Sequence, residues 1–226
     1  MRHEDKLTRT SKGLYIIYKN LHKSFGPQHW WPGETPFEVM VGAILTQNTN
    51  WQNVERAIAN LKKNKVLDPK KLSQLPHKKL AKMIRSAGYF NIKAKRLKNF
   101  LKFYLESYNA DARKMRQADT QVLSNELLKV NGVGEETADS ILLYALNKPV
   151  FVVDAYTKRI YSRHGFIAED ARYQAVKELF MKNLKNDVQL FNEYHALLVR
   201  LGKEYCLKSK PRCDSCPLSK QNHKYD

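Results

Sequence analysis

The chain has 226 residues, of which 42% are hydrophobic, so it is long enough for one large domain or two small ones. Lys and Arg number 40 against 22 Asp and Glu, and the formal net charge of +18 favours a polyanionic partner. The sequence has no basic amphipathic anchor, no apolar run near the roughly 18 residues that span a bilayer and no signal-peptide core in residues 1–10, which argues against a membrane or secreted protein.

The first predicted helix covers residues 5–25, because Leu14, Ile17 and Leu21 repeat at helical spacing. The loop that follows, residues 26–33, places two adjacent tryptophans between two prolines. Large aromatic residues in a loop form either a packed corner or a wall on which a nucleic-acid base stacks. Both interpretations stay open on the residues alone.

Residues 37–61 are predicted to form one long helix, or two helices with a break. The break falls at residues 46–51, where polar residues interrupt the apolar pattern and where Asn48 and Asn50 favour a turn. We expect Trp51 to start the second of the two helices.

The segment 62–110 is heavily basic and is predicted to form a pair of helices joined by a link at residues 86–91. Cations follow the link at once, at Lys93, Lys95, Arg96 and Lys98. This arrangement is either a loop that contacts nucleic acid or an exposed turn with a solvated cationic helix.

The strongest pattern in the chain begins with a short helix. We expect this helix to bury Leu123, Leu127 and Leu128. Asp119 or Thr120 is expected to cap its start, because a polar residue directly before an apolar pattern is typical of a helix N-terminus.

A tight turn, residues 131–134, joins this helix to a second one. Gly132 and Gly134 permit backbone angles that a side chain would block, and they leave bare N–H groups at the start of the second helix. Such a start is suited to a phosphate, because the N–H groups and the helix dipole point the same way. Lys148-Pro149 ends the second helix, and an apolar run then leads to Asp154.

Asp154 is expected to cap a helix over residues 155–164, and two more helices are predicted near 169–185 and 187–204. A cap is compatible with chemistry, because one carboxylate oxygen fixes the helix start while the other stays available. His195 lies among apolar residues of the last helix and is interpreted as a core or boundary histidine.

The hairpin and the aspartate resemble those of the endonuclease III superfamily of DNA glycosylases. The matching strings are Gly132-Val133-Gly134, Thr137-Ala138 and Val152-Val153-Asp154. A glycine pair alone also occurs in ordinary helix–helix connections, but here the hairpin, the Lys-Pro break and the aspartate follow in the family's order and spacing. The resemblance implies that Asp154 stabilises a cationic sugar and orients or activates a water, as in glycoside hydrolysis.

The same resemblance implies an all-α fold with two helical lobes and a DNA-binding cleft between them. A six-helix barrel that carries the helix-hairpin-helix would span residues 36–151, and residues 1–35 plus 152–226 would form the second domain. The implied partner is double-stranded DNA with a damaged base. We expect the protein to act as a monomer, in the cytoplasm, on the nucleoid.

Two further positions match residues that this family inserts into DNA. Gln47 matches a glutamine that enters the DNA stack, although a helix-capping role is the alternative. Tyr89 matches the wedge in a Gly-aromatic-Asn-x-Lys-Ala string, with Phe90 behind it. The residues expected to contact DNA are Gln47, Tyr89, Asn91, Lys93, Gly132, Gly134, Thr137, Lys208, Lys210 and Arg212.

Three clustered cysteines near the C-terminus favour ligation over a disulfide framework. Their Cys-x6-Cys-x2-Cys spacing resembles the iron–sulfur loop of endonuclease III, so Cys206, Cys213 and Cys216 are expected to hold an iron–sulfur cluster, of the 4Fe-4S type. The family's fourth cysteine is replaced by Asn222, with His223 next to it, so the fourth ligand is unassigned. Zinc held with His223, or a loop without metal, are the alternatives.

Bifunctional members of the superfamily carry a lysine two residues after the second hairpin glycine, and that position is Glu136 here. A carboxylate cannot form a Schiff base with the sugar. The protein is therefore expected to remove a base with water and to leave an abasic site, without β-lyase activity.

The positions Trp30, Trp31, Pro32 and Trp51 resemble the base pocket of the 3-methyladenine DNA glycosylase branch. A methylated purine is cationic, indole faces attract cations by roughly 0.5–2 kcal/mol, and the base must be flipped out of the duplex. We expect base excision repair of alkylated purines such as 3-methyladenine. The alternatives are another lesion (uracil, hypoxanthine or mismatched thymine) or a non-catalytic DNA-binding protein.

Overall fold

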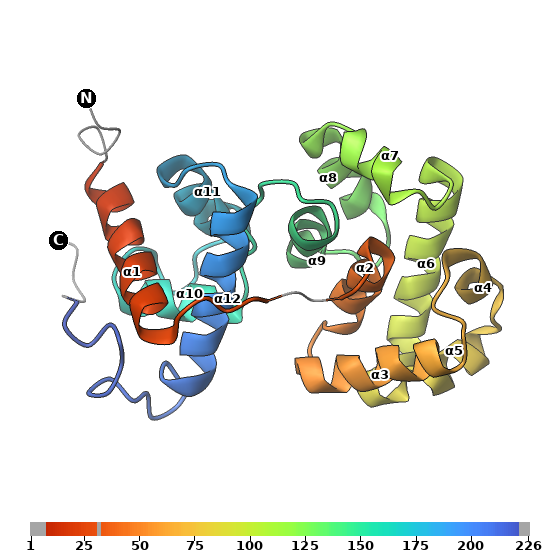
Figure 1. The fold of residues 1–226 in the computed structure, drawn as a ribbon, viewed down its shortest axis with the longest axis horizontal. Helices are drawn as coiled ribbons and strands as arrows, with labels where there is room; N and C mark the ends of the chain where they lie inside the picture. Colours follow the sequence, from red (N-terminus) through yellow and green to blue (C-terminus); the bar gives the residue numbers. More distant parts are fainter. Residues whose placement is uncertain (1–7, 31–32, 222–226) are drawn as a thin grey trace. The chain divides into compact units, whose positions relative to one another are not determined.

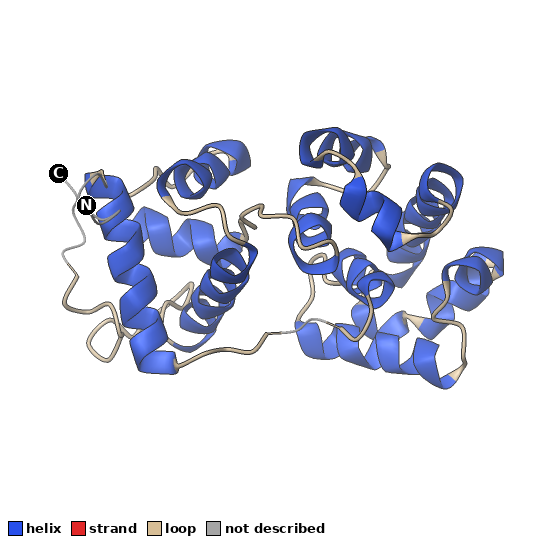
Figure 2. Ribbon diagram, turned by 45° about the horizontal axis from the view of Figure 1, so that its top comes forward, coloured by secondary structure: helices blue, strands red, loops and turns tan. Residues whose placement is uncertain are grey.

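The structure is a computed structural model that describes residues 8–30 and 33–221. Every regular element in these two stretches is a helix (Figure 1, Figure 2). The all-α fold class expected from the sequence is therefore confirmed. Among the described residues, none of the helices is long and apolar enough to span a membrane.

The chain divides into two compact units. We call Met1–Trp30 together with Pro149–Asp226 unit 1, and Trp31–Lys148 unit 2. Unit 1 joins two segments that are far apart in the sequence, whereas unit 2 is one continuous segment. The expected domain boundaries, near residues 36 and 151, stay a prediction.

Unit 1 contains four helices in its described part. They are α1 (Arg9–Phe25), α10 (Ala155–Arg163), α11 (Tyr173–Asn183) and α12 (Val188–Glu204). The red α1 and the blue α12 come from opposite ends of the chain and pack against each other (Figure 1).

Unit 2 begins with α2 (Pro36–Leu45) and ends with a helix of the π type, η3 (Ile141–Ala145). The elements between them are α3 (Trp51–Lys63), α4 (Pro69–Gln74), α5 (His77–Met83), the 3-10 helix η2 (Arg85–Ala87), α6 (Phe90–Tyr108), α7 (Ala112–Gln117), α8 (Thr120–Lys129) and α9 (Glu135–Ser140).

Side-chain caps fix where several helices begin. Thr8 accepts a hydrogen bond from the Ser11 N–H at 3.0 Å and starts α1. Asn50 accepts from the Asn53 N–H at 3.0 Å, so α3 begins at Trp51 as the sequence predicted. Each cap satisfies an N–H group that has no partner inside its helix.

Asp119 is the residue that caps α8, since its carboxylate accepts from the N–H groups of Gln121 and Val122, both at 2.9 Å. The apolar face of this helix is narrower than predicted. Leu123 and Leu127 are fully buried, but Leu128 is 42% exposed, so its expected burial was wrong. Leu128 follows Leu127 by one position, which turns it about 100° away from the core.

The basic segment 62–110 holds more helices than the pair that was predicted. Pro69 starts α4 and Pro76 precedes α5, so the part of the segment before the predicted link holds two short helices. Proline lacks the N–H group that a continuing helix needs, which explains the division. Only α6, the second of the predicted pair, is a long helix.

Aromatic rings fill the core of unit 1. Phe151 stacks on Phe180 with ring centroids 3.8 Å apart, and Phe191 meets Phe151 edge-on at 5.5 Å. The backbone of α12 also approaches α10 closely at Gly202, because a Cβ there would lie 2.3 Å from Cδ1 of Tyr156. This approach places Tyr156, near the start of α10, against the last turn of α12.

Candidate active site and nucleic-acid interface

Asp154 stands at the end of a fully buried apolar run and at the start of α10. Its Oδ1 accepts hydrogen bonds from the N–H of Thr157 at 2.7 Å and from the Thr157 hydroxyl at 2.8 Å. The predicted capping role is thus confirmed. The cap uses one carboxylate oxygen, so the orientation of the other oxygen, Oδ2, is fixed by the same contacts.

His195 lies against this second oxygen. Its Nε2 is 3.6 Å from Oδ2 of Asp154, and both side chains are largely buried, with 5% and 12% of their surfaces exposed. Burial alone would raise the pKa of the Asp154 carboxyl. The imidazole of His195 and the hydrogen bonds from Thr157 outweigh this effect and lower the pKa of Asp154 below its usual value. The buried carboxyl is therefore ionised at neutral pH.

The sequence pattern placed His195 in the core, and the structure shows it buried there at 4% exposure. What the pattern missed is the contact with Asp154. The contact arises because α10 and α12 approach closely at Gly202, and the spacing of apolar residues within α12 carries no information about that approach.

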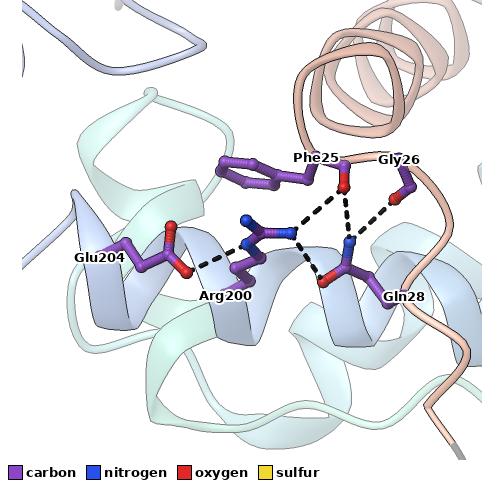
Figure 3. Close-up of polar contacts among 5 residues, drawn as sticks. All are labelled: Phe25, Gly26, Gln28, Arg200 and Glu204. Atoms are coloured by element: carbon purple, nitrogen blue, oxygen red, sulfur yellow. Dashed lines mark hydrogen bonds and ion pairs between the residues drawn. The ribbon is translucent and has the colours of Figure 1, made fainter.

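Trp30 stacks on His195, with ring centroids 5.4 Å apart and planes 14° from parallel. The residues that precede Trp30 are hydrogen-bonded to α12. The Gln28 N–H donates to Glu193 at 2.7 Å, and Arg200 donates to the Phe25 carbonyl at 3.2 Å (Figure 3). The guanidinium of Arg200 also lies 4.5 Å from the centroid of the Phe25 ring.

Figure 3 shows how the side chain of Gln28 completes this anchor. Its Nε2 donates to the carbonyls of Phe25 and Gly26, at 3.2 and 2.8 Å, while Arg200 reaches both Gln28 and Glu204. The loop that leads to Trp30 is thus bonded to α12, the helix that carries His195.

Three further residues were expected in the base pocket with Trp30. Trp31 and Pro32 lie outside the described residues. Trp51 belongs to unit 2, where its ring packs on α2: a Cβ at Gly42 would lie 3.2 Å from Cη2 of Trp51. Trp30 belongs to unit 1, so the four-residue base pocket stays a prediction.

Gln47 bonds to the hairpin. Its Nε2 donates to the carbonyl of Gly132 and to the hydroxyl of Thr137, both at 2.9 Å. Its Oε1 accepts a hydrogen bond from the guanidinium of Arg96. The alternative of a helix cap does not describe these contacts, and Arg96 is a partner that sequence reasoning missed. No local pattern separates Arg96 from the cations around it.

The turn of the hairpin has the backbone that glycine allows. Gly132 has a φ of +97°, and a Cβ there would lie 2.2 Å from Cγ of Arg96. Gly134 is exposed, and a Cβ there would meet nothing within 4 Å. Glu136, at the position of the family's lysine, is exposed in the first turn of α9.

Tyr89 is the most exposed of the large hydrophobic residues in the described chain, at 68%. It directly follows Gly88 and has a φ of +43°, a left-handed conformation that is unusual for a bulky residue. Ile92, 53% exposed, lies one helical turn further along α6. Asn91 is also exposed, and its carbonyl accepts from Nε2 of His77 at 3.1 Å. The surface that carries Tyr89 is therefore open to a partner.

Lys93 was expected to contact DNA, and the structure contradicts this. The residue is 1% exposed. Its ammonium donates to the carbonyls of Leu45 at 2.8 Å and Ala87 at 2.6 Å, where α2 and η2 end. Burial, with help from the positive charge of Arg96, lowers the pKa of Lys93 to about 8. Lys93 therefore links the end of α2, which precedes the turn of Gln47, to the end of η2, which precedes the loop of Tyr89.

The C-terminal loop presents its cations to solvent. Lys208, Lys210 and Arg212 are all exposed. The backbone around them is held by Arg163, which donates to the carbonyls of Leu207 at 2.8 Å and of Lys208 at 3.0 Å. Their predicted contact with DNA stays a prediction.

The three cysteines are free thiols in the structure. Arg163 approaches Sγ of Cys206 at 3.3 Å, and burial with the neighbouring cysteines raises the pKa of Cys216. Within residues 8–30 and 33–221, no group of three or more His, Cys, Asp or Glu side chains is arranged to hold a metal. The structure thus does not confirm the predicted cluster, and Asn222 and His223 lie outside the described residues.

Comparison with known proteins places these features in one family. A family model for HhH-GPD superfamily base excision DNA repair proteins matches residues 41–186. The Methanocaldococcus jannaschii protein named "Putative DNA repair glycosylase MJ1434" is 54% identical over 206 residues, which cover 91% of this chain and 93% of that protein. Endonuclease III of Thermotoga maritima is 29% identical over 188 residues, 83% of this chain and 82% of that protein.

Among solved structures, the H. pylori 3-methyladenine DNA glycosylase MagIII bound to 1,N6-ethenoadenine is similar to this chain. The TM-score is 0.73 at 29% sequence identity, and the match covers 86% of this chain and 97% of that one. The match therefore extends over both units.

The buried ammonium of Lys93 predicts a pH dependence of stability. Its pKa is about 8 in the folded protein and 10.5 ordinarily, so above pH 8 the unfolded chain binds more protons than the folded one. The free energy of unfolding of wild type, minus that of Lys93→Met, should therefore rise between pH 8 and 10.5, by on the order of 3 kcal/mol. Urea denaturation across this range measures the difference.

Lys102→Met is the matched control, because Lys102 is exposed on the same helix. The free energy of unfolding of wild type, minus that of Lys102→Met, should stay nearly constant over the same pH range. A Lys93→Met difference that is equally flat would contradict the burial of the charge.

Proposed function

Because the chain belongs to the HhH-GPD superfamily of base excision DNA repair proteins, we propose that it hydrolyses the N-glycosidic bond of alkylated purines such as 3-methyladenine. The class of activity, that of a base excision repair DNA glycosylase, follows from the family. The lesion and the absence of lyase activity are the parts that we propose.

The observation that carries the proposal is the fixed, ionised carboxylate of Asp154. As the glycosidic bond breaks, the sugar gains positive charge, and a negative oxygen held nearby stabilises that charge. The helix start holds Oδ1, and His195 faces Oδ2, so the group does not have to reorganise during the reaction. The same carboxylate can orient or activate the water that attacks the sugar.

Two observations favour an alkylated purine as the base. Trp30 presents an electron-rich indole in unit 1, next to the residue that faces Asp154, and cationic bases are attracted to indole faces. The MagIII structure, similar over nearly its whole length, is bound to a modified adenine. An alkylated purine is also a good leaving group, so its release does not require a strong general acid.

Incubation with methylated duplex DNA, followed by identification of the released bases by mass, tests the lesion. Defined duplexes with uracil, hypoxanthine or a G·T mismatch are assayed in parallel. Release of methylated purines is the expected result. A preference for uracil, hypoxanthine or mismatched thymine would overturn the lesion assignment and leave the family intact.

Asp154→Asn should fold normally, because asparagine caps a helix as well as aspartate does. Its excision rate should fall by about 10²–10⁴-fold, since the amide cannot stabilise the cationic sugar. The rate is measured under single-turnover conditions with the base that wild type releases, and DNA affinity is measured alongside.

Asp187→Asn is the matched control, because Asp187 caps α12 in the same unit and accepts from the Leu190 N–H at 2.9 Å. It should keep wild-type excision. If Asp154→Asn turns over as fast as Asp187→Asn, Asp154 is a cap without a chemical role.

Glu136 supports removal of the base by water alone. It is exposed at the start of α9, where bifunctional relatives resembling this chain carry the attacking lysine. A carboxylate does not form an imine with the sugar. We therefore propose that the product is an intact abasic site.

Borohydride trapping tests this proposal. Wild type mixed with its damaged DNA and borohydride should yield no covalent protein–DNA adduct, and the DNA strand should stay uncut until alkali is added. A bifunctional glycosylase serves as the positive control. An adduct that peptide mapping assigns to a lysine of this chain would show lyase chemistry.

The iron–sulfur cluster stays a prediction, because the described thiols do not converge on a metal and no step above depends on one. Analysis of purified protein for iron and acid-labile sulfide decides between the cluster and its alternatives. Iron with sulfide, lost in Cys213→Ser, is the expected result. About one zinc per chain, or no metal, would contradict it.

A further inference from the structure

Three segments of unit 2 meet at the amide of Gln47. They are the turn after α2, which carries Gln47, the hairpin with Gly132 and Thr137, and α6 with Arg96. Lys93 adds a second connection, because its ammonium joins the last carbonyls of α2 and η2. The loop with Tyr89 follows η2 directly, so the hairpin and this loop are connected through side chains.

The amide of Gln47 is nearly saturated by these contacts. A glutamine amide has two N–H donors and one oxygen acceptor. Both donors are directed to the hairpin, and the oxygen accepts from Arg96. The orientation of the amide is therefore determined by its partners. In this conformation Gln47 has no donor left for a base.

Arg96 reaches the hairpin in a second way. Its aliphatic stem lies where a Cβ of residue 132 would be, 2.2 Å from Cγ. Only glycine leaves this room, so the stem of Arg96 covers the turn while its guanidinium binds Gln47. Arg96 is half-buried, whereas its neighbour Lys95 is exposed.

We propose that Arg96 is a positioning residue for base excision: through Gln47 it fixes the hairpin against α6, so that hairpin and Tyr89 loop meet DNA as one preformed surface. The proposal rests on the DNA glycosylase activity proposed above, but not on which base is removed. Arg96 acts through Gln47 and does not touch the reacting atoms.

The hairpin and the Tyr89 loop need to be aligned before DNA binds, because base excision requires a flipped base in a defined place. Small displacements of groups that hold a substrate reduce rates strongly, by about 10²-fold for 1 Å. If the hairpin moves relative to α6, DNA still binds through its phosphates. The flipped state then forms less often, which lowers the rate even when all DNA is bound.

Arg96→Met tests the proposal, because methionine retains part of the stem over Gly132 and loses the bond to Gln47. Lys95→Met is the matched control, since it removes the same charge from the next position of α6. We expect Lys95→Met to change only DNA affinity and its salt dependence. Arg96→Met should in addition lower the single-turnover rate at saturating protein, by about 10-fold or more.

A second measurement needs no substrate. Amide hydrogen exchange at Val133, whose N–H donates to the Val130 carbonyl at 2.9 Å, should be faster in Arg96→Met and in Gln47→Met than in wild type, and unchanged in Lys95→Met. If Arg96→Met does not fold, Gln47→Met interrupts the same contact from the other side. Unchanged exchange at the hairpin in the folded variant would overturn the proposal.

The double variant Gln47→Met/Arg96→Met shows whether Arg96 acts through Gln47. If it does, the double variant is no slower than the slower single variant. The proposal would be overturned if the rate losses of the two single variants multiplied in the double variant. It would also be overturned if Arg96→Met and Lys95→Met had the same single-turnover rate at saturating protein. The rates use whichever base wild type releases, so a wrong lesion assignment leaves this test intact.

Discussion

The candidate active site depends on the contact between the carboxylate of Asp154 and the N-terminus of α10. An ionised carboxylate is costly to bury unless hydrogen bonds and a partner compensate it. Here Thr157 and His195 do so from two different helices, α10 and α12. Both helices must approach closely for this, and Gly202 supplies the room. The site therefore depends on close packing of the two helices, which Gly202 makes against Tyr156, two residues after Asp154.

Unit 2 uses part of its positive charge internally. Lys93 and Lys98 donate to backbone carbonyls, and Arg96 donates to Gln47, so three of the four cations that follow the Tyr89 loop are engaged within the fold. The net charge of +18 thus overstates what this segment offers to phosphates. These hydrogen bonds join the turn of Gln47, the hairpin and the start of α6 into one arrangement.

Features that depend on neighbours in sequence were predictable, and those that depend on folding were not. The break before Trp51, the cap at Asp119 and the cap at Asp154 follow from local polar residues, and the structure has all three. The contacts of His195 and Arg96 join segments far apart in the chain, so periodicity could not find them. The burial of Lys93 was not predicted, because a lysine within a basic run is usually exposed to solvent. The π-helical turn η3 left no signal in the sequence either.

The discontinuity of unit 1 determines when each part of the protein can fold. The apolar face of α1 is buried in unit 1, where the helix packs on α12, which follows the whole of unit 2 in the sequence. Unit 2 is continuous and has all its residues available earlier, so during synthesis it can fold before unit 1, as domains generally fold as units. The amphipathic helix α1 therefore stays without its partner α12 while unit 2 is synthesised. Closing unit 1 requires contacts of high sequence separation, and such contacts form more slowly than local ones.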